Sequence, residues 1–305
     1  MPETDLFSEL RPKAFAIAYR MLGSVSDAED VVQEAFLRMH QAMREGAEIS
    51  SPRAYVATLV TRQAIDQLRS ARVRRERYVG EWLPEPLMTD PSPAEQAETA
   101  DSLSLAFLVL LENLTPPQRA AFLLREVFDY PYADVAGIVG TDVDTTRHLV
   151  AKARAHLQER RPRYHASPRQ QEELTRRFFA AAERGDLSEL EQLLAKDAAF
   201  HGDGGGKVPA MARAVTGGDN IARILARWLP RLRQLGVRVE VTMVNGGPGA
   251  VTFDADDRIV GVLGVTIVDG RITTIHSIVN PDKLRHLGPT SDLGRHLQSG
   301  ARPWS

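Results

Sequence analysis

Apolar residues recur with a helical period through most of the first 80 residues. They are spaced by three and four positions from Leu6 to Met21, from Asp27 to Met43, and again along the stretch from Pro52 to Tyr78, which is the pattern of amphipathic helices. Gly23 is placed to end the first helix, and Ser26 opens a capping-box pattern that begins the second. We therefore expect three helices that pack along their apolar faces.

A second helical group has the punctuation of a helix-turn-helix. Thr115 and the two prolines after it predict a helix start, and one amphipathic helix is expected from Arg119 to Phe128. A short helix from Tyr132 to Val139 should end at Gly140, and a third helix with its own cap should run to about Leu157. This group is either a DNA-binding module or ordinary packing of three short helices.

The third of these helices carries polar and cationic residues on the face opposite its apolar stripe. Short polar groups near a helix start suit contact with base edges, and cations further along suit contact with phosphates. A solvated cationic face is the alternative interpretation. The candidate DNA-contacting residues are Thr145, Arg147, His148, Lys152 and Arg154.

The pattern changes after a basic, proline-interrupted hinge at Glu159 to Gln170. Helices are expected at Gln171 to Arg184, Leu187 to Leu194 and Ala222 to Leu235. Alternating segments separated by Asn-Gly and Asp-Gly turns predict strands. These strands are expected at Val237 to Val244, Ala250 to Phe253, Ile259 to Val268 and Ile272 to Val279. Helices followed by a four-stranded meander predict an α+β domain.

Composition narrows the class of protein. A chain of 305 residues can hold two or three domains. It has no cysteine, which excludes a disulfide framework, a thiolate metal site and a cysteine nucleophile. The acidic N-terminus has no apolar run and the chain has no apolar stretch of membrane-spanning length. We therefore expect no signal peptide and no membrane span, and a cytoplasmic protein.

The net charge of −2 hides a strong unevenness along the chain. Arginines crowd the second half of the helix that begins at Pro52, with Tyr55 and Tyr78 at either end. This block fits either a surface that follows phosphates and stacks on a base, or a solvated helix end. Asp27, Asp30, Gln33 and Glu34 instead make one face of the preceding helix acidic, which suits a basic protein partner or, equally, plain solvation.

Between Arg77 and Arg119 there is no lysine or arginine, whereas acidic residues accumulate. Prolines at 84, 86, 91 and 93 keep the first half of this stretch extended. The stretch is therefore predicted to be an acidic linker between two nucleic-acid-binding modules, and it could occupy a cationic channel.

These features together resemble the extracytoplasmic-function (ECF) sigma factors of bacterial RNA polymerase, with the signature DAEDVVQEAF at Asp27 to Phe36. The resemblance implies two all-α sigma domains, a region 2 helical bundle and a region 4 helix-turn-helix. It also implies core RNA polymerase, through its beta-prime clamp and beta flap, and promoter DNA as partners. Asp27, Asp30, Gln33 and Glu34 would bind the polymerase, and Thr145, Arg147, His148, Lys152 and Arg154 the −35 element. The −10 element would be read by Arg53, Tyr55, Arg62, Asp66, Arg69 and Arg72.

The linker motif at Trp82 to Pro86 is similar to that of a subgroup, the sigma-J-like factors, that carries a SnoaL-like extension. The implied C-terminal fold is an α+β, NTF2-like cone built on a curved sheet. The expected boundaries are region 2 at 1–80, linker 81–113, region 4 at 114–160, hinge 161–170, SnoaL-like domain 171–285 and a flexible tail at 286–305.

Two further stretches, at residues 203–207 and 280–284, match the subgroup. We expect both to make a regulatory contact with the linker or the sigma modules. The plainer interpretation of residues 203–207 is a flexible glycine loop, and that of residues 280–284 is a proline turn. Trp82 would then be a linker residue buried against the nearest helix. The residues of the expected contact are Trp82, Leu83, Pro84, Glu85, Pro86, Asp203, Gly204, Gly205, Gly206, Lys207, Asn280, Pro281, Asp282, Lys283 and Leu284.

SnoaL-like folds elsewhere include enzymes, so His201, Asp203, Asp254 and His276 are weighed as acid/base groups. Fold kinship does not carry chemistry, and we expect no catalysis, cofactor or metal, although a small molecule could occupy the pocket. The alternatives are a DNA-binding regulator that senses a small molecule, and a pocket enzyme fused to a DNA tether.

Overall fold

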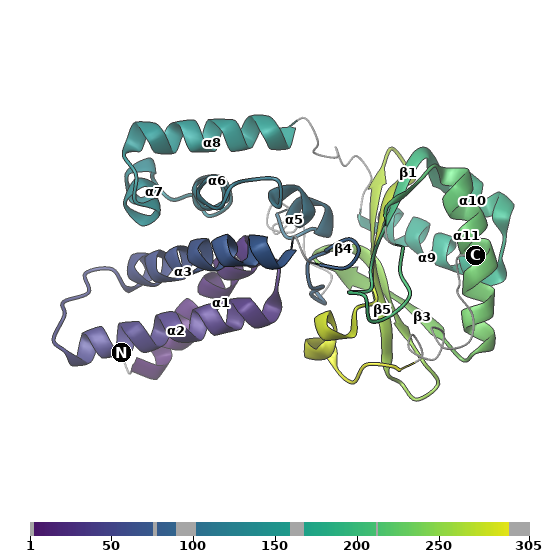
Figure 1. Ribbon diagram of the computed structural model, residues 1–305, viewed down its shortest axis with the longest axis horizontal. Helices are drawn as coiled ribbons and strands as arrows, with labels where there is room; N and C mark the ends of the chain where they lie inside the picture. Colours follow the sequence, from purple (N-terminus) through teal and green to yellow (C-terminus); the bar gives the residue numbers. More distant parts are fainter. Residues whose placement is uncertain (1–2, 76–77, 90–101, 159–167, 212, 293–305) are drawn as a thin grey trace. The chain divides into compact units, whose positions relative to one another are not determined.

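The computed structural model describes residues 3–75, 78–89, 102–158, 168–211 and 213–292 (Figure 1). The chain divides into two compact units. One unit combines Met1–Arg77 with Leu108–Arg161, and the other combines Tyr78–Phe107 with Pro162–Ser305. The start of the linker therefore belongs with the C-terminal domain and not with the helices that it joins.

Three helices form the first bundle. Gly23 takes the left-handed conformation (φ 66°) and ends the first helix. The extended Ser24 then caps the second helix, and its hydroxyl accepts a hydrogen bond from the Asp27 amide at 3.2 Å. The predicted cap at Ser26 is therefore wrong by two residues. The helices are α1 (Glu3–Leu22), α2 (Val25–Arg44) and α3 (Pro52–Arg75).

The second helical group departs from the prediction at one point. The single helix expected from Arg119 to Phe128 is a short α-helix followed by one π-helical turn, and Asp129 then reverses the chain with φ 53°. The helix stop at Gly140 is confirmed (φ 78°), and Asp142 caps the helix that follows through the Thr145 amide. The elements are α5 (Leu105–Leu111), α6 (Pro116–Phe122), η2 (Leu123–Val127), α7 (Tyr132–Val139) and α8 (Val143–Gln158).

A buried arginine joins the two helical groups of this unit. Arg119 of α6 is 2 % exposed and donates to the carbonyl oxygens of Met21 at 2.6 Å and Leu111 at 3.0 Å. Burial lowers the pKa of Arg119 to about 9, and its guanidinium lies 2.9 Å from the Glu112 carboxylate. Because a buried charge must keep its partners, α6 is fixed against the end of α1.

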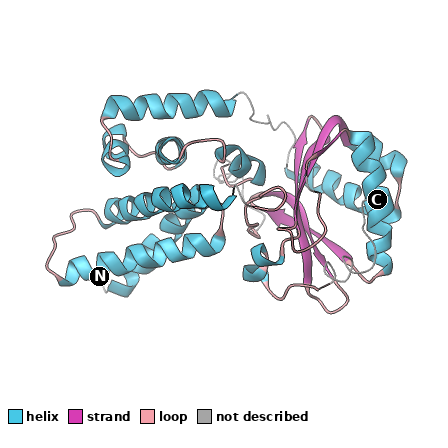
Figure 2. Ribbon diagram, viewed as in Figure 1, coloured by secondary structure: helices cyan, strands magenta, loops and turns pink. Residues whose placement is uncertain are grey.

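The C-terminal domain is a six-stranded sheet with three helices on one face (Figure 2). The strand order is β2-β1-β6-β5-β4-β3, in which β1 and β6 are parallel and all other neighbours are antiparallel. The helices are α9 (Pro168–Arg184), α10 (Leu187–Leu193) and α11 (Gly218–Gln234). The strands are β1 (Leu194–Asp203), β2 (Val215–Thr216), β3 (Arg238–Val244), β4 (Gly247–Phe253), β5 (Ile259–Val268) and β6 (Arg271–Ile278).

The expected four-stranded meander is therefore incomplete, because β1 and β2 were not predicted. Lys196 and Asp197 interrupt the apolar alternation of β1, and its register with β6 shifts between Leu194 and Ala199. The core of the domain lies between the sheet and the helices, around Phe178, Ile221 and Ile275. In the described parts of the chain, no helix is long and apolar enough to cross a membrane.

Candidate functional site

The alternation of β1 sorts its side chains between the two faces of the sheet. Phe200 and Gly202 line a cavity under α11. His201 and Asp203 face the other way, where the imidazole Nδ1 of His201 donates to the Glu81 carboxylate at 2.6 Å. The face of the sheet away from the helices is thus the docking surface of the linker.

Asp203 is the centre of this docking surface. Its carboxylate is fully buried (0 % exposed) and accepts four hydrogen bonds. Tyr78 Oη at 2.5 Å and the Gly205 amide at 3.1 Å donate to Oδ1. The Leu83 amide at 2.8 Å and Lys283 Nζ at 2.6 Å donate to Oδ2. Charge-assisted bonds of this kind are stronger than neutral ones, so the linker backbone is held in one register.

Lys283 binds the linker next to Asp203. Its buried ammonium donates to the Leu83 carbonyl as well as to Asp203, and it lies 4.1 Å from the ring centroid of Trp82 and 5.1 Å from that of Tyr78. Burial and the bond to Asp203 raise the pKa of the Tyr78 phenol. The tyrosine therefore remains a proton donor to the carboxylate.

The segment that carries Lys283 is itself fixed by hydrogen bonds. Asn280 Nδ2 donates to Tyr78 Oη at 2.8 Å, and Asn280 Oδ1 accepts from the Asp282 amide at 3.1 Å. Asp282 forms an ion pair with Lys207. Asn280 thus begins the short 3-10 helix η3 (Pro281–Lys283). A second short 3-10 helix, η4 (Arg285–Leu287), follows it.

Steric crowding and backbone conformation explain why the loop after Asp203 has three glycines. Gly205 and Gly206 have φ of 59° and 69°, which side chains rarely adopt. A Cβ on Gly205 would overlap the Asn280 amide, and one on Gly206 would lie 3.0 Å from the Val79 side chain. Gly204 would overlap the Val208 carbonyl. The loop is therefore packed tightly between the linker and η3, and is not a free flexible loop.

The motif at residues 82–86 is buried in this site. Leu83, Pro84, Glu85 and Pro86 are all buried, and the Pro86 carbonyl accepts from His286 Nε2 at 2.7 Å. The structure therefore brings the three predicted motifs together. Tyr78, Glu81 and His286, which also hold the linker, were not among the predicted contact residues. Tyr78 and Glu81 directly precede the linker motif, but Tyr78 was interpreted as an aromatic residue that could stack on a base.

Asn245 makes a second attachment of the linker, although its sequence context predicted only a turn residue. It is 0 % exposed at the β3–β4 turn and takes φ 52°. Its Oδ1 accepts from the Leu87 amide at 2.9 Å and its Nδ2 donates to the Leu103 carbonyl at 3.1 Å. One side chain therefore holds the linker on both sides of residues 90–101, which lie outside the described residues.

Two histidines stack beneath the linker on the paired strands β1 and β6. The rings of His201 and His276 are 5.2 Å apart. Burial, together with the neighbouring His201, lowers the pKa of His276 to about 3. His276 is therefore a neutral, buried group at ordinary pH.

The predicted polymerase-binding residues lie along one side of α2, where Asp30, Gln33 and Glu34 are exposed and Asp27 is half-buried. Beside them is an apolar groove that the sequence interpretation did not include. Its wall contains the paired rings of Phe7 and Phe36, and Leu37, which is 58 % exposed. Exposed apolar side chains beside an acidic stripe are typical of a protein-binding surface.

Several of the residues predicted to read the −10 element have partners within the protein. Arg53 pairs with Glu9, and Asp66 pairs with Arg69 at 3.1 Å. Arg62 donates to the Gly137 carbonyl at 2.8 Å and the Ile138 carbonyl at 3.1 Å, at the end of α7. Tyr55 is half-buried, and the side chain of Arg72 lies outside the described residues.

The five predicted −35 residues lie on α8 and differ in their surroundings. Thr145, Arg147, His148, Lys152 and Arg154 are all exposed. Arg147 lies 3.0 Å from the Asp144 carboxylate, and the His148 ring contacts the Asp144 carbonyl at 2.8 Å. Arg154 makes two 2.8 Å bonds to Glu126 of η2. Arg154 therefore also fixes α8 to η2.

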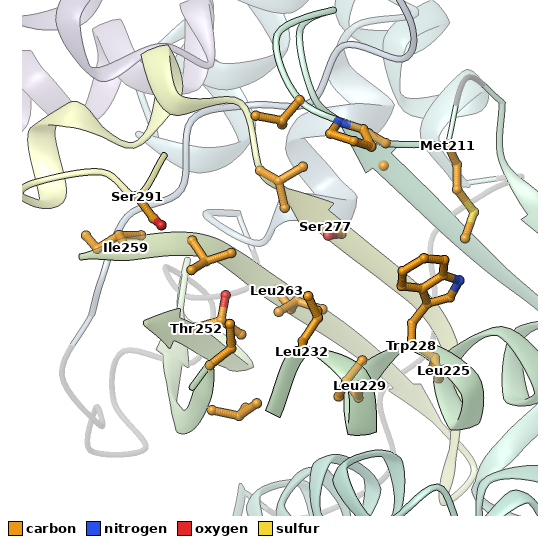
Figure 3. A pocket seen from close by; sticks show the side chains of 18 of the residues that line it. Met211, Leu225, Trp228, Leu229, Leu232, Thr252, Ile259, Leu263, Ser277 and Ser291 are labelled. Atoms are coloured by element: carbon orange, nitrogen blue, oxygen red, sulfur yellow. The ribbon is translucent and has the colours of Figure 1, made fainter. Parts of the chain in front are cut away.

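The cavity under α11 has a volume of about 180 Å³. Figure 3 shows that its walls are mostly apolar, with Trp228 and Leu229 on the helix and Leu263 on the sheet. None of the four acid/base candidates lines it. His201, Asp203 and His276 lie on the linker side, and Asp254 accepts the Asp256 and Arg258 amides in the turn after β4.

Comparison with known proteins finds two sigma-factor regions and a C-terminal SnoaL-like domain in the chain. Sigma-70 region 2 matches residues 6–74, Sigma-70 region 4 matches 104–157, and a SnoaL-like domain matches 175–275. The chain is 36 % identical over 315 residues to the ECF RNA polymerase sigma factor SigJ of Mycobacterium tuberculosis, which covers 96 % of this chain and 99 % of SigJ. The chain belongs to the ECF RNA polymerase sigma factors.

This sigma factor is also similar to the crystal structure of M. tuberculosis SigJ, with a TM-score of 0.74 and 34 % identity over 94 % of this chain and 100 % of that one. It is 32 % identical to the probable sigma factor SigI of the same species, over 88 % of this chain and 90 % of SigI. The predicted family and fold class are confirmed. Membership in the family implies binding to core RNA polymerase and to promoter DNA.

Proposed function

We propose that the SnoaL-like domain regulates this sigma factor by holding the linker between sigma regions 2 and 4. The observation that carries the proposal is the buried Asp203 carboxylate, which binds the linker through the Leu83 amide and through Tyr78. The linker has no cation of its own between residues 78 and 107. A linker bound in this way is withheld from any cationic channel of the polymerase that it would otherwise enter.

The energetics of the site favour a two-state linker. Asp203 and Lys283 are both buried, and removing one partner of such a pair costs about 3–5 kcal/mol because the other charge is left unpaired. The linker contributes the Tyr78 hydroxyl and the Leu83 peptide to the same cluster. It is therefore bound as a unit or released as a unit. A bound linker lowers the population of sigma factor that is competent to spread over polymerase and promoter.

The surfaces of the sigma regions are assigned from their chemistry. The acidic side of α2 with Asp27, Asp30, Gln33 and Glu34 would bind the beta-prime clamp, and the groove at Leu37 would add apolar area to that contact. Region 4 would bind the beta flap. Its exposed residues Thr145, Arg147, His148 and Lys152 would contact the −35 element.

The −10 element would be read by the predicted side of α3, with Arg53, Tyr55, Arg62, Asp66, Arg69 and Arg72. Arg62 would first have to leave the carbonyl groups at the end of α7. Separation of α3 from α7 is therefore part of the proposed activation.

The domain acts in this proposal as a regulatory module and not as an enzyme. Catalysis by proton transfer needs an acid or base within reach of a substrate in a cavity. The only ionisable residues in the described lining of the cavity are Glu183 and Arg233. His201, Asp203 and His276 instead bind or support the linker, which supports a structural use of these groups.

Run-off transcription with purified core RNA polymerase tests the proposal. Lys283→Met in the full chain removes the ammonium that binds the Leu83 carbonyl, and we expect it to release the linker and raise transcript yield severalfold. Lys196→Met changes an exposed lysine of β1 in the same domain and should leave the yield unchanged. Equal yields from Lys283→Met and the unmodified chain would refute the proposal.

A further inference from the structure

The wall of the apolar cavity is built in part from the motif that holds the linker. Pro281 and Leu284 line the cavity, and both are buried. Between them, Asp282 pairs with Lys207, and Lys283 binds the Leu83 carbonyl and Asp203. One short segment therefore has two faces, of which one closes the cavity and the other binds the linker.

The glycine loop at residues 203–207 is connected to the cavity in the same way. Val208, Pro209 and Ala210 line the cavity and directly follow the glycine loop that packs against Val79 and Asn280. The Gly204 carbonyl accepts the Val208 amide at 3.3 Å, which fixes the loop to these residues. A shift of the cavity wall at either motif would therefore move groups that contact the linker.

The chemistry of the cavity selects the class of molecule that it can hold. Most of its described lining is aliphatic or aromatic, and its hydroxyl groups come from Thr252, Ser277 and Ser291. Its volume of about 180 Å³ is close to that of an engineered apolar cavity of about 150 Å³ that remains dry and binds benzene. The ionisable residues of its described lining are the half-buried Glu183 and the exposed Arg233, so a charged ligand would lose its hydration without gaining a fully buried partner of opposite charge.

We propose that this cavity is an effector site for an uncharged, apolar molecule of about one or two rings, and that its occupancy strengthens the binding of the linker. A ligand in the cavity contacts Pro281, Leu284 and Val208 in the positions that they take when the linker is bound. If the linker is released and these segments move, the ligand loses part of its wall. By linkage, the ligand favours the bound linker, and the bound linker favours the ligand. The effect on transcription, unlike the coupling itself, rests on the proposed function above.

The test uses 6-propionyl-2-dimethylaminonaphthalene, an uncharged aromatic ketone of two fused rings whose fluorescence rises in apolar surroundings, with the full chain. We expect saturable binding. At saturation, hydrogen exchange of the Leu83 and Leu87 amides should slow by about fivefold or more, the lower end of ordinary allosteric coupling. Both amides donate to side chains of the docking surface, so their exchange reports release of the linker.

Two substitutions to tryptophan on α11 give the matched control. Leu229→Trp fills the cavity and should abolish probe binding, whereas Arg227→Trp places the same ring on an exposed position of the same helix and should not. Val239→Phe, on the sheet side of the cavity, repeats the test if Leu229→Trp does not fold.

Three results would overturn the inference. These are no probe binding by the unmodified chain, binding that survives both filling substitutions, and binding that leaves exchange of Leu83 and Leu87 unchanged. The proposed function can fail separately. If Lys283→Met leaves transcription unchanged while the probe slows hydrogen exchange of the Leu83 and Leu87 amides, the regulatory role is refuted and the effector site is supported.

Discussion

Single side chains decide where the linker is held, and only some of them could be foreseen. Asp203 and Lys283 were predicted because they lie in recognisable motifs. Asn245 was interpreted only as a turn residue, since an Asn-Gly pair between two strands is fully explained by the left-handed backbone that the turn requires. Its bonds to Leu87 and Leu103 depend on burial, which nothing in the local sequence reveals.

Asn245→Gly should weaken the second attachment without disturbing the turn, because glycine accepts the same positive φ. Two buried hydrogen bonds are lost, at about 1 kcal/mol each. We expect exchange of the Leu87 amide to become about tenfold faster or more. Asp269→Gly is the control, since Asp269 has φ 49° at the exposed β5–β6 turn. The same acceleration in both variants would show that Asn245 acts through the turn and not through the linker.

His276 should make the stability of the C-terminal domain depend on pH. Its pKa is about 3 in the folded state, against 6.5 for an unperturbed histidine, because burial opposes its charged form. Below pH 6.5 the unfolded chain therefore binds a proton that the folded chain does not, and the free energy of unfolding falls as the pH falls.

Between pH 7 and 5.5 this loss should be about 1 kcal/mol. It should disappear in His276→Gln. Urea unfolding followed by tryptophan fluorescence measures it, since Trp82 and Trp228 lie in the unit that contains this domain, and residues 1–77 and 108–161 contain no tryptophan. An equal loss in both proteins would assign the pH dependence to other groups.

Elements whose apolar residues follow a clear period were predictable. A strand with an interrupted period and a local change of helix type were not. The helices of the first bundle and the helix stop at Gly140 follow directly from apolar spacing and glycine. The strand β1 was missed because Lys196 and Asp197 break its alternation. The π-helical turn at Leu123–Val127 was missed because the same apolar spacing fits a continuous α-helix.

Two substitutions on the exposed face of α8 should affect DNA binding in different ways. If Arg147 pairs with a guanine edge, Arg147→Ala should cost about 1–3 kcal/mol at that base pair and relax the sequence preference there. Lys152→Ala should weaken binding to all sequences alike, because a phosphate contact carries no sequence information. Holoenzyme binding to a set of promoter variants distinguishes the two. A uniform loss for Arg147→Ala would remove Arg147 from the base-reading set.

At the scale of the whole molecule, the order of the modules was predictable, and the resemblance led us to expect that residues 82–86 contact the C-terminal motifs. How the rest of the linker packs was not predictable. Its prolines and acidic residues predict an extended tether, and the structure instead groups Tyr78–Phe107 with the C-terminal domain. Part of this packing depends on Gly264, where an added Cβ would lie 2.7 Å from the Leu105 side chain. Such complementarity between distant segments has no signature in either segment alone.

A reversible disulfide between the linker and the sheet would show whether release of the linker activates this sigma factor. Met88 and Val244 form an antiparallel bridge, between the bonds from Thr89 N to the Met243 carbonyl and from Asn245 N to the Leu87 carbonyl. Opposed residues in such a position are about 4.5 Å apart at Cα, within the range of a disulfide. The chain has no cysteine of its own, so Met88→Cys with Val244→Cys can form one disulfide only.

Run-off transcription should be measured with this double variant, oxidised and then reduced. We expect the yield from the oxidised protein to be lower by about tenfold or more, because the disulfide keeps the linker bound and so lowers the population of sigma factor with a released linker. Reduction should restore the yield, and each single variant should be insensitive to the reductant. An oxidised protein that transcribes as well as the reduced one would contradict the claim that linker release activates this sigma factor.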